Sequence, residues 1–271
     1  MDNLHRKLAP ISQAAWDQIE DEARRTFVTR IAGRRVVDMP DAGGVGLAAI
    51  ATGHVESIDP LVAGLETRRR LVQPLIELRA PFEVTREAVD DVERGAQDSD
   101  WQPVKDAVES LATAEDTLVF VGSSEAGVAG ITTATSNARI TLAEDVRKLP
   151  DAVAEALTVL RTVGVQGPYA LLLSSDLFTA TVESSDQGYP IQEHLRRMLG
   201  DEGEIVFASA LQGALVLSLR GGDFTLTLGQ DVSIGYLSHD AERIRLYAQE
   251  SLTFRVDTAE ASVVLSRPSI A

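Results

Sequence analysis

The chain has 271 residues, of which 44% are hydrophobic and 5% are aromatic, with no cysteine and a formal net charge of -16. The absence of cysteine excludes disulfides, thiolate metal sites and cysteine nucleophiles, and the acidic charge disfavours nucleic-acid partners because it repels phosphate backbones. No run approaches the roughly 20 apolar residues that a bilayer span needs, and residues 1–10 lack the apolar core of a signal peptide. We therefore expect a cytoplasmic globular protein with no membrane partner.

An amphipathic helix is predicted near the start of the chain. Ser12 is a suitable N-cap and Gly33 a suitable stop. The apolar positions between them follow the helical repeat closely: Trp16, Ile19, Ala23, Phe27 and Ile31. Two interpretations of this face remain open: the face packs on a sheet near the C-terminus, or part of it forms a docking groove.

Residues 47–80 mix apolar and charged types with weak alternation, and we expect a long two-stranded arm that leaves the core and returns. An isolated two-stranded ribbon is marginal in water, so the arm needs a partner surface. The glycines of 43–46 precede it and superficially suggest a phosphate cradle. No Lys-Ser or Lys-Thr pair follows them, so a phosphate-binding loop is disfavoured.

The middle of the chain predicts a compact α/β subdomain over residues 131–220. A helix is expected before it at 103–118, and helices within it at 150–163 and from Pro190 to Gly200, each with apolar residues at helical spacing. The continuous apolar run of 169–174 indicates a strand buried on both faces. Further strands are expected at 205–208 and 214–219, with a short strand or buried turn at 118–122 and a polar loop at 181–189.

The stretch from Arg220 to Leu265 predicts an antiparallel, consecutively connected sheet. Phe224, Leu226 and Leu228 alternate with threonines, and the same period of two recurs over 244–248 and 252–256. Ser238-His239-Asp240 separates two of these runs and is typical of a turn in which Asp240 bonds to its own backbone. Whatever precedes this sheet must cover its buried face.

No motif for catalysis or metal binding emerges from the residues. The four histidines, His5, His54, His194 and His239, lie far apart without metal-ligand spacing. The loop 122–127 lacks the Gly-x-Ser-x-Gly spacing of a nucleophile elbow, and the adjacent acids at 90–91 fit a solvated or salt-bridged role. We therefore predict a structural or binding protein, not an enzyme, with no metal site.

Several motifs occur in order along the whole chain and together resemble encapsulin shell proteins, also called the linocin bacteriocin family. They are Asn3-Leu4-His5-Arg6, Leu8-Ala9-Pro10-Ile11, Gly33-Arg34-Arg35-Val36-Val37-Asp38, Asp90-Asp91-Val92-Glu93-Arg94-Gly95, Gly167-Pro168-Tyr169-Ala170-Leu171, Gly188-Tyr189-Pro190, Arg220-Gly221-Gly222-Asp223-Phe224, Gly229-Gln230-Asp231-Val232-Ser233-Ile234-Gly235-Tyr236 and Thr253-Phe254-Arg255-Val256. The resemblance implies an α+β fold, that of tailed-phage major capsid proteins. It places the P-domain at 1–46, 81–130 and 221–271, the E-loop at 47–80 and the A-domain at 131–220.

The resemblance also implies a function. Encapsulins build closed icosahedral homo-oligomeric shells in the bacterial cytoplasm and enclose cargo enzymes, commonly dye-decolourising peroxidases or ferritin-like proteins, whose roles are oxidative stress defence or iron storage. A C-terminal targeting peptide on the cargo docks on the inner shell surface. The family points to six positions for that groove: Phe27, Ile31, Arg34, Asp38, Asp231 and Ile234. Apolar residues among them would bury aliphatic side chains of the peptide, while Arg34 and Asp38 would fix its backbone or polar groups.

A second implied site is a loop around the five-fold pore, formed by Ser184, Ser185, Asp186, Gln187, Gly188 and Tyr189. Symmetry would turn Asp186 into a ring of like charge that favours cations; an ordinary solvated loop is the alternative. Some relatives bind a flavin through an exposed tryptophan, but neither Trp16 nor Trp101 matches it, so no cofactor is expected. Alternative identities are a phage or prophage major capsid protein, and a secreted bacteriocin or peptidase.

Overall fold

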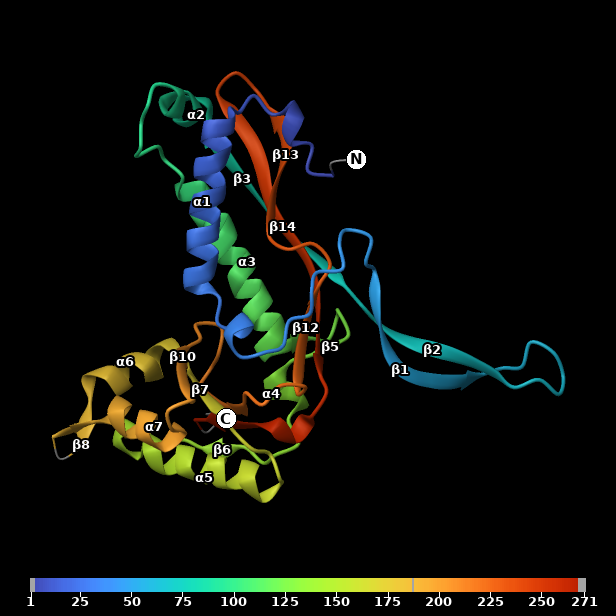
Figure 1. Cartoon of the computed structure of the whole chain (residues 1–271), viewed down its shortest axis with the longest axis vertical. Coiled ribbons are helices and arrows are strands. Elements are labelled where there is room, and N and C mark those ends of the chain that lie inside the picture. The colour runs from blue at the N-terminus through green and yellow to red at the C-terminus, as the bar shows by residue number, and fades with distance from the viewer. Residues whose placement is uncertain (1–2, 187, 268–271) are drawn as a thin grey trace.

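A computed structural model describes residues 3–186 and 188–267 of the chain. Two regions lie end to end, and a two-stranded ribbon projects sideways from the place where they meet (Figure 1). We call the one built on the longest strands the long-strand region and the other the five-stranded region. Within the described residues, none of the helices combines the length and the apolar character needed to cross a membrane.

The sheet of the long-strand region is organised around one central strand. Its members are β3 (Ile76–Thr85), β12 (Phe224–Leu228), β13 (Ser233–His239) and β14 (Arg243–Val256). Strand β14 pairs antiparallel with β3 along one edge, and with β13 and then β12 along the other. The predicted consecutive connection is therefore wrong, because β12 and β13 do not pair with each other. The two apolar runs at 244–248 and 252–256 form one unbroken strand, β14, which is long enough to pair with both β13 and β12.

Three helices cover this sheet: α1 (Gln13–Arg30), α2 (Arg86–Glu93) and α3 (Gln102–Phe120). The Ser12 hydroxyl caps α1 by accepting a hydrogen bond from the Ala15 backbone N–H at 3.2 Å. The apolar face of α1 packs mainly on α3, and α3 in turn contacts β3 and β14. The apolar side chains of α1, α3 and the sheet form one buried cluster, so the first helix covers the sheet chiefly through α3. Helix α3 runs on to Phe120, where a short strand or turn had been predicted.

The five-stranded region has the strand order β10-β7-β11-β15-β6. Its strands are β6 (Ile140–Thr141), β7 (Tyr169–Leu173), β10 (Glu204–Phe207), β11 (Ala214–Ser218) and β15 (Ser262–Ser266). Its helices are α4 (Ile131–Ala134), α5 (Leu149–Thr162), α6 (Ser175–Glu183) and α7 (Ile191–Leu199). Strand β7 is buried along its whole length, as predicted from its continuous apolar run.

Three boundaries differ from those predicted. Strand β15 pairs antiparallel with β11 in the five-stranded region, so the range 221–271 does not form a single sheet. Residues 76–80 belong to β3, which pairs with β14, so the free part of the arm ends near Pro74 rather than at residue 80. Helix α6 extends to Glu183 because Leu177 and Thr181, four residues apart, are both buried; the polar loop is therefore shorter than predicted.

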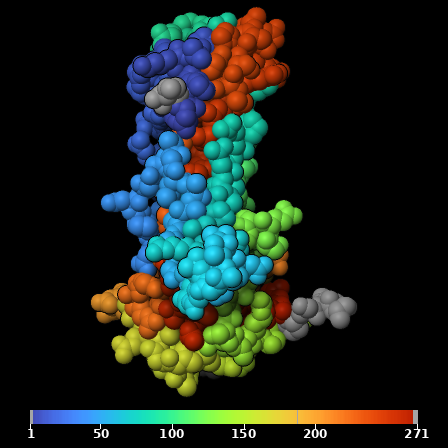
Figure 2. Space-filling view, turned by 90° about the vertical axis from the view of Figure 1, so that its right-hand side faces the viewer, coloured from blue at the N-terminus to red at the C-terminus, as the bar shows by residue number. Residues whose placement is uncertain are grey.

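The projecting ribbon consists of β1 (Ala49–Ile58) and β2 (Thr67–Pro74), paired antiparallel with an irregularity between Ala51 and Val55. In Figure 2 the ribbon points toward the viewer, and the N-terminal segment lies beside β13 and β14. A hydrogen bond of 2.8 Å from the Tyr236 N–H to the Leu4 carbonyl holds the N-terminal segment there.

Short elements complete the fold: η1 (Arg6–Leu8), η2 (Gly33–Arg35), η3 (Val146–Lys148), η4 (Ala259–Ala261), β4 (Gly122–Ser123), β5 (Val128–Ala129), β8 (Ser185–Asp186) and β9 (Tyr189–Pro190). Strands β4 and β5 pair antiparallel, so the loop 122–127, which lacks the spacing of a nucleophile elbow, belongs to a hairpin. A Cβ on Gly130 would lie 2.3 Å from the Gly122 nitrogen, so the two backbones touch only because both residues are glycine. The turn predicted at Asp240 is confirmed, since its carboxylate accepts from the Glu242 and Arg243 N–H groups.

The buried ring of Phe254 on β14 provides a test of the core. Phe254→Ala is expected to lower the free energy of unfolding by about 3–5 kcal/mol, because it removes a large buried side chain and leaves a cavity. Phe207→Ala is the matched control: that ring is partly exposed and packs edge-on against Phe178, so a loss of about 1 kcal/mol is expected. Equilibrium denaturation measures both, and equal losses would contradict the packing described.

Candidate functional site

A groove of about 380 Å³ opens between the C-terminal half of α1 and the start of β13. Four of the six residues predicted for a docking groove line it: Phe27, Arg34, Asp231 and Ile234. Six further lining residues were not singled out from the sequence: Glu20, Ala23, Arg24, Val28, Val232 and Ser233. The groove thus brings residues 231–234 next to the C-terminal half of the first helix.

The other two predicted residues lie elsewhere. Ile31 is 8% exposed and belongs to the core between α1 and the sheet. Asp38 lies beside β12, where its N–H donates to the Phe224 carbonyl at 2.9 Å and its Oδ2 accepts from the Gly222 N–H at 2.6 Å. Its carboxylate therefore stabilises the glycine turn before β12, and the structure does not bring it into the groove.

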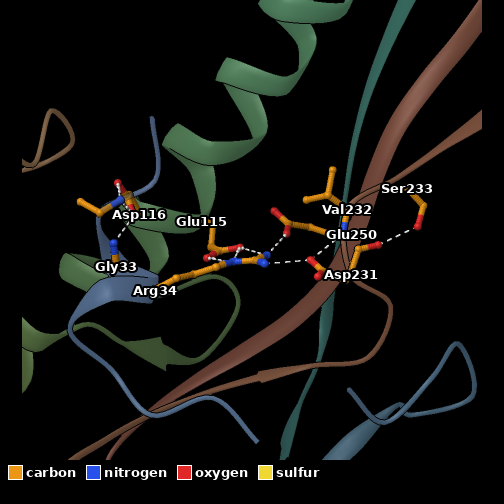
Figure 3. Close-up of polar contacts among 9 residues, drawn as sticks. Gly33, Arg34, Glu115, Asp116, Asp231, Val232, Ser233 and Glu250 are labelled. Carbon is orange, nitrogen blue, oxygen red and sulfur yellow. Dashed lines mark hydrogen bonds and ion pairs between the residues drawn. The ribbon is translucent and has the colours of Figure 1, made fainter. Parts of the chain in front are cut away.

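Arg34 lines the groove, and its guanidinium contacts three carboxyl groups (Figure 3). Its Nε donates to both carboxylate oxygens of Glu115, at 2.8 and 3.1 Å. Its Nη2 donates to Glu115 Oε2 at 2.6 Å and to Glu250 Oε2 at 3.2 Å, and its Nη1 donates to Asp231 Oδ1 at 2.9 Å. The guanidinium carbon lies 4.5 Å from the centre of the Phe27 ring, in cation–π geometry.

These contacts change the role predicted for Arg34. A guanidinium has five N–H donors, and the hydrogen bonds to Glu115, Glu250 and Asp231 engage all three of its nitrogens. Only the second N–H of Nη1 has no acceptor among the described residues. Arg34 is therefore mainly a structural link, with a single donor left for a docked ligand.

The charges around Arg34 differ strongly in exposure. The Glu115 and Glu250 side chains are 0% exposed, whereas that of Asp231 is 57% exposed at the rim. Burial by itself would lower the pKa of Arg34, but the hydrogen bond and charge of Glu115, with smaller effects from Asp231, raise it above its usual value. Arg34 is therefore charged at every accessible pH, and the cluster is an ionic one.

A second buried carboxylate positions the segment that carries Arg34. Asp116 Oδ1 accepts from the Gly33 N–H at 2.7 Å, and Oδ2 accepts from the Ala32 N–H at 3.0 Å. Burial raises the pKa of Asp116 to about 7, although these two backbone hydrogen bonds act to lower it. A Cβ on Gly33 would lie 3.0 Å from Asp116 Oδ1, so glycine permits this close approach.

Sequence reasoning missed the buried carboxyls, although a signal for them exists. Glu115 continues the helical spacing of Val104, Val108 and Leu111, so it falls on the apolar face of α3. Glu250 interrupts a strand whose neighbouring positions are mostly buried. An acid on an otherwise apolar face needs a buried partner, and an arginine elsewhere in the chain supplies it. Among the described residues, no group of three or more His, Cys, Asp or Glu side chains is arranged to hold a metal ion.

The residues predicted for a pore loop form a small protruding hairpin after α6 (Figure 1). Asp186 pairs with Tyr189, and Ser185 with Pro190. Ser184 is half-buried and its carbonyl accepts from the Ile191 N–H at 3.1 Å, while Gly188 is exposed at the turn. Gln187 lies outside the described residues. The carboxylate of Asp186 is thus carried on an exposed tip.

The fold is similar to those of solved shell and capsid proteins. A virus-like particle from Pyrococcus furiosus matches 92% of this chain and 98% of its own with a TM-score of 0.64 at 14% identity. The capsid of Myoviridae phage XM1 matches 87% of this chain and 90% of its own with a TM-score of 0.54 at 10% identity. The class of protein is therefore the α+β capsid fold, as predicted.

Sequence relatives define the family within that class. A family model described as an encapsulating protein for peroxidase matches residues 1–253. Type 1 encapsulin shell proteins from Rhodococcus erythropolis and Mycobacterium tuberculosis are 56% and 53% identical over 266 residues, covering 98% of this chain and 100% of each relative. The chain belongs to the type 1 encapsulin shell-protein family. Its role is accordingly that of a shell-forming structural protein rather than an enzyme.

Removing Arg34 tests the ionic cluster. Arg34→Met is expected to lower the free energy of unfolding by about 3–5 kcal/mol, because it leaves buried carboxyls without their positive partner. The adjacent Arg35→Met is the matched control: its pair with Glu204, at 3.3 Å, is half exposed, and a change below about 1 kcal/mol is expected. Equilibrium denaturation of the two variants side by side checks this, and a similar small loss for both would contradict it.

Proposed function

We propose that this chain assembles with copies of itself into a closed icosahedral shell in the bacterial cytoplasm, and that the groove beside α1 binds a C-terminal targeting peptide of an enclosed enzyme. In the terms of the capsid fold, the long-strand region corresponds to the P-domain, the five-stranded region to the A-domain and the ribbon to the E-loop. The observation that carries the peptide proposal is a groove open to solvent, lined in equal number by apolar side chains and by polar or charged ones, on a member of a shell-protein family.

The ribbon supports assembly. Its apolar side chains are exposed in the single chain: Val55, Ile58, Leu61, Val62, Leu65 and Val72. Such a surface is favourable only when another surface covers it, and a second copy supplies one. Residues 49–74 also contain three acidic and three basic residues, whereas the chain as a whole has a net charge of -16. A neutral arm can therefore lie on an acidic neighbour without the repulsion that two acidic surfaces would experience.

The chemistry of the groove suits a short peptide with aliphatic side chains. Val28 supplies the exposed apolar surface of the groove, with 69% of its surface exposed, while Phe27 and Ile234 line it although they are mostly buried. Arg34 and Asp231 add one donor and one carboxylate to this lining. Apolar burial supplies affinity, and a few polar groups fix orientation in ligand sites of this size. The family description favours a peroxidase as the cargo; a ferritin-like protein is the other candidate.

Of the alternative identities, the phage capsid protein shares the fold but only at low sequence identity, whereas the relatives above half identity are encapsulin shell proteins. A secreted bacteriocin or peptidase gains no support from the residues of the groove. A flavin or another cofactor is not part of the proposal.

Val28 allows cargo binding to be tested without damage to the core. Val28→Asp is expected to leave shell assembly intact and to reduce the cargo that copurifies by tenfold or more, about 1.4 kcal/mol, because a charge replaces an apolar contact surface. Val163→Asp alters a similarly exposed valine on the five-stranded region and should retain cargo. Electron microscopy and protein quantification of purified shells measure both. Normal loading of Val28→Asp shells would exclude the groove as the cargo site.

The hairpin at 185–190 allows the pore proposal to be tested. If five copies bring Asp186 into one ring, Asp186→Lys reverses its charge and should slow the entry of small cations by about tenfold or more, with faster entry of anions. Asp98→Lys changes an exposed acid in the long-strand region and should have no such effect. Stopped-flow quenching of an enclosed dye by charged quenchers reports the rates, and equal rates in both variants would count against gating.

A further inference from the structure

Glu250 has an unusual position for a carboxyl group. It lies in the middle of β14, opposite Leu78 of β3, and is 0% exposed. Its Oε2 accepts a hydrogen bond from Arg34 Nη2 at 3.2 Å. Its Oε1 is buried and receives no hydrogen bond from any described residue. A carboxylate oxygen in that state has lost its hydration without a replacement, which costs free energy.

The charges nearby do not balance if every group is ionised. One guanidinium contacts two fully buried carboxyls, those of Glu115 and Glu250, and the exposed Asp231 adds a third negative charge. Two carboxylates that share one buried site cannot both stay ionised at low cost, and one of them binds a proton. Burial, then the charge of Glu115 and a hydrogen bond with it, raise the pKa of Glu250 well above its ordinary value.

The contacts indicate which carboxyl holds the proton. Glu115 receives hydrogen bonds from both Nε and Nη2 of Arg34, the closest at 2.6 Å, which is the bidentate geometry of an ionised carboxylate. Glu250 receives a single, longer one and has the oxygen without a donor. A proton on the Glu250 carboxyl makes that side chain a donor, and Glu115 is the carboxyl within hydrogen-bonding reach of it.

Other charged groups near β14 do not alter this balance. On β3, Glu77 and Arg79 flank Leu78 and form an ion pair with each other at 3.2 Å, largely exposed. On α3, Asp116 follows Glu115 but accepts from the backbone of 32–33. Strand β13 faces this part of β14 through Ser233, opposite Gln249, which carries no charge.

We propose that Glu250 is a positioning residue of the groove: at neutral pH it holds a proton and donates it to Glu115, and the pair fixes Arg34 against Phe27 as one charge-balanced unit. Loss of that proton at higher pH places two adjacent negative charges in the core and weakens the contacts that hold Arg34 in the lining of the groove. The functional consequence is weaker peptide binding at high pH. Only this consequence rests on the function proposed above.

Infrared spectroscopy tests the proton directly. Purified shells of the wild type and of Glu202→Gln, which changes an exposed glutamate, are expected to show the carbonyl stretch of a protonated carboxyl at pH 7. Glu250→Gln is expected to lack that part of the band. If all three proteins give the same band, the proton is not on Glu250 and the proposal is overturned. Should Glu250→Gln fail to assemble, the wild type decides alone: the band must persist near pH 9, where Asp116 is mostly ionised.

The pH dependence of stability separates this role from a merely structural one. A raised pKa in the folded state gives stability that is fully present below the ordinary glutamate pKa, about 4.3, and lost as pH rises toward the folded value. The unfolding equilibrium constant of the wild type should therefore increase relative to Glu250→Gln by up to tenfold for each pH unit above about 5. Glutamine can donate to Glu115 and accept from Arg34, so it mimics the protonated side chain.

Unfolding midpoints of shells between about pH 5 and 9 provide the measurement, with Glu202→Gln parallel to the wild type. Parallel curves for Glu250→Gln and the wild type would overturn the proposal. Neither this experiment nor the infrared one needs cargo. Failure of the cargo function would thus leave both results unchanged, whereas failure of the proton proposal would change both.

Discussion

The groove and the junction behind it depend on one buried ionic interaction, between the guanidinium of Arg34 and the carboxyls of Glu115 and Glu250. Its members come from η2, α3 and β14, so it joins the end of the first helix to the second long helix and the central strand (Figure 3). Desolvation of these charges is costly and is offset only when the guanidinium is almost fully hydrogen-bonded. We infer that the cluster contributes to the specificity of this packing more than to net stability.

Around this junction, one part of the molecule buries its apolar side chains within the single chain, and another part leaves them exposed. The two sheets and their helices bury nearly all of their large apolar side chains within one chain. The ribbon of β1 and β2 instead leaves its apolar side chains exposed, and only another molecule can cover them. This difference between the two parts fits a shell-forming family, because a subunit with a stable body and an unpartnered arm is suited to association with its copies.

Local patterns predicted much of the fold because the interactions behind them are local. The Ser12 cap, the all-apolar run of β7 and the turn at Asp240 depend on residues within a few positions of one another. The predictions were wrong where strand pairing between distant parts of the chain determines the fold. Strand β15 follows the C-terminal sheet in sequence but pairs with β11. Asp38, placed in the groove by resemblance, stabilises a glycine turn instead. Residue type could not distinguish these outcomes, because an apolar strand can pair at more than one sheet edge.

The sequence by itself determined the class of the protein, because motifs spread over the whole chain resemble one family, and the relatives in that family are shell proteins. Tertiary structure alone decided which residues meet. Phe27, Arg34, Asp231 and Ile234 are brought together because α1 ends over the start of β13. The buried glutamates behind Arg34 come from positions 81 and 216 residues away in sequence. Charge balance in a buried site is a property of three-dimensional proximity, which no local pattern encodes.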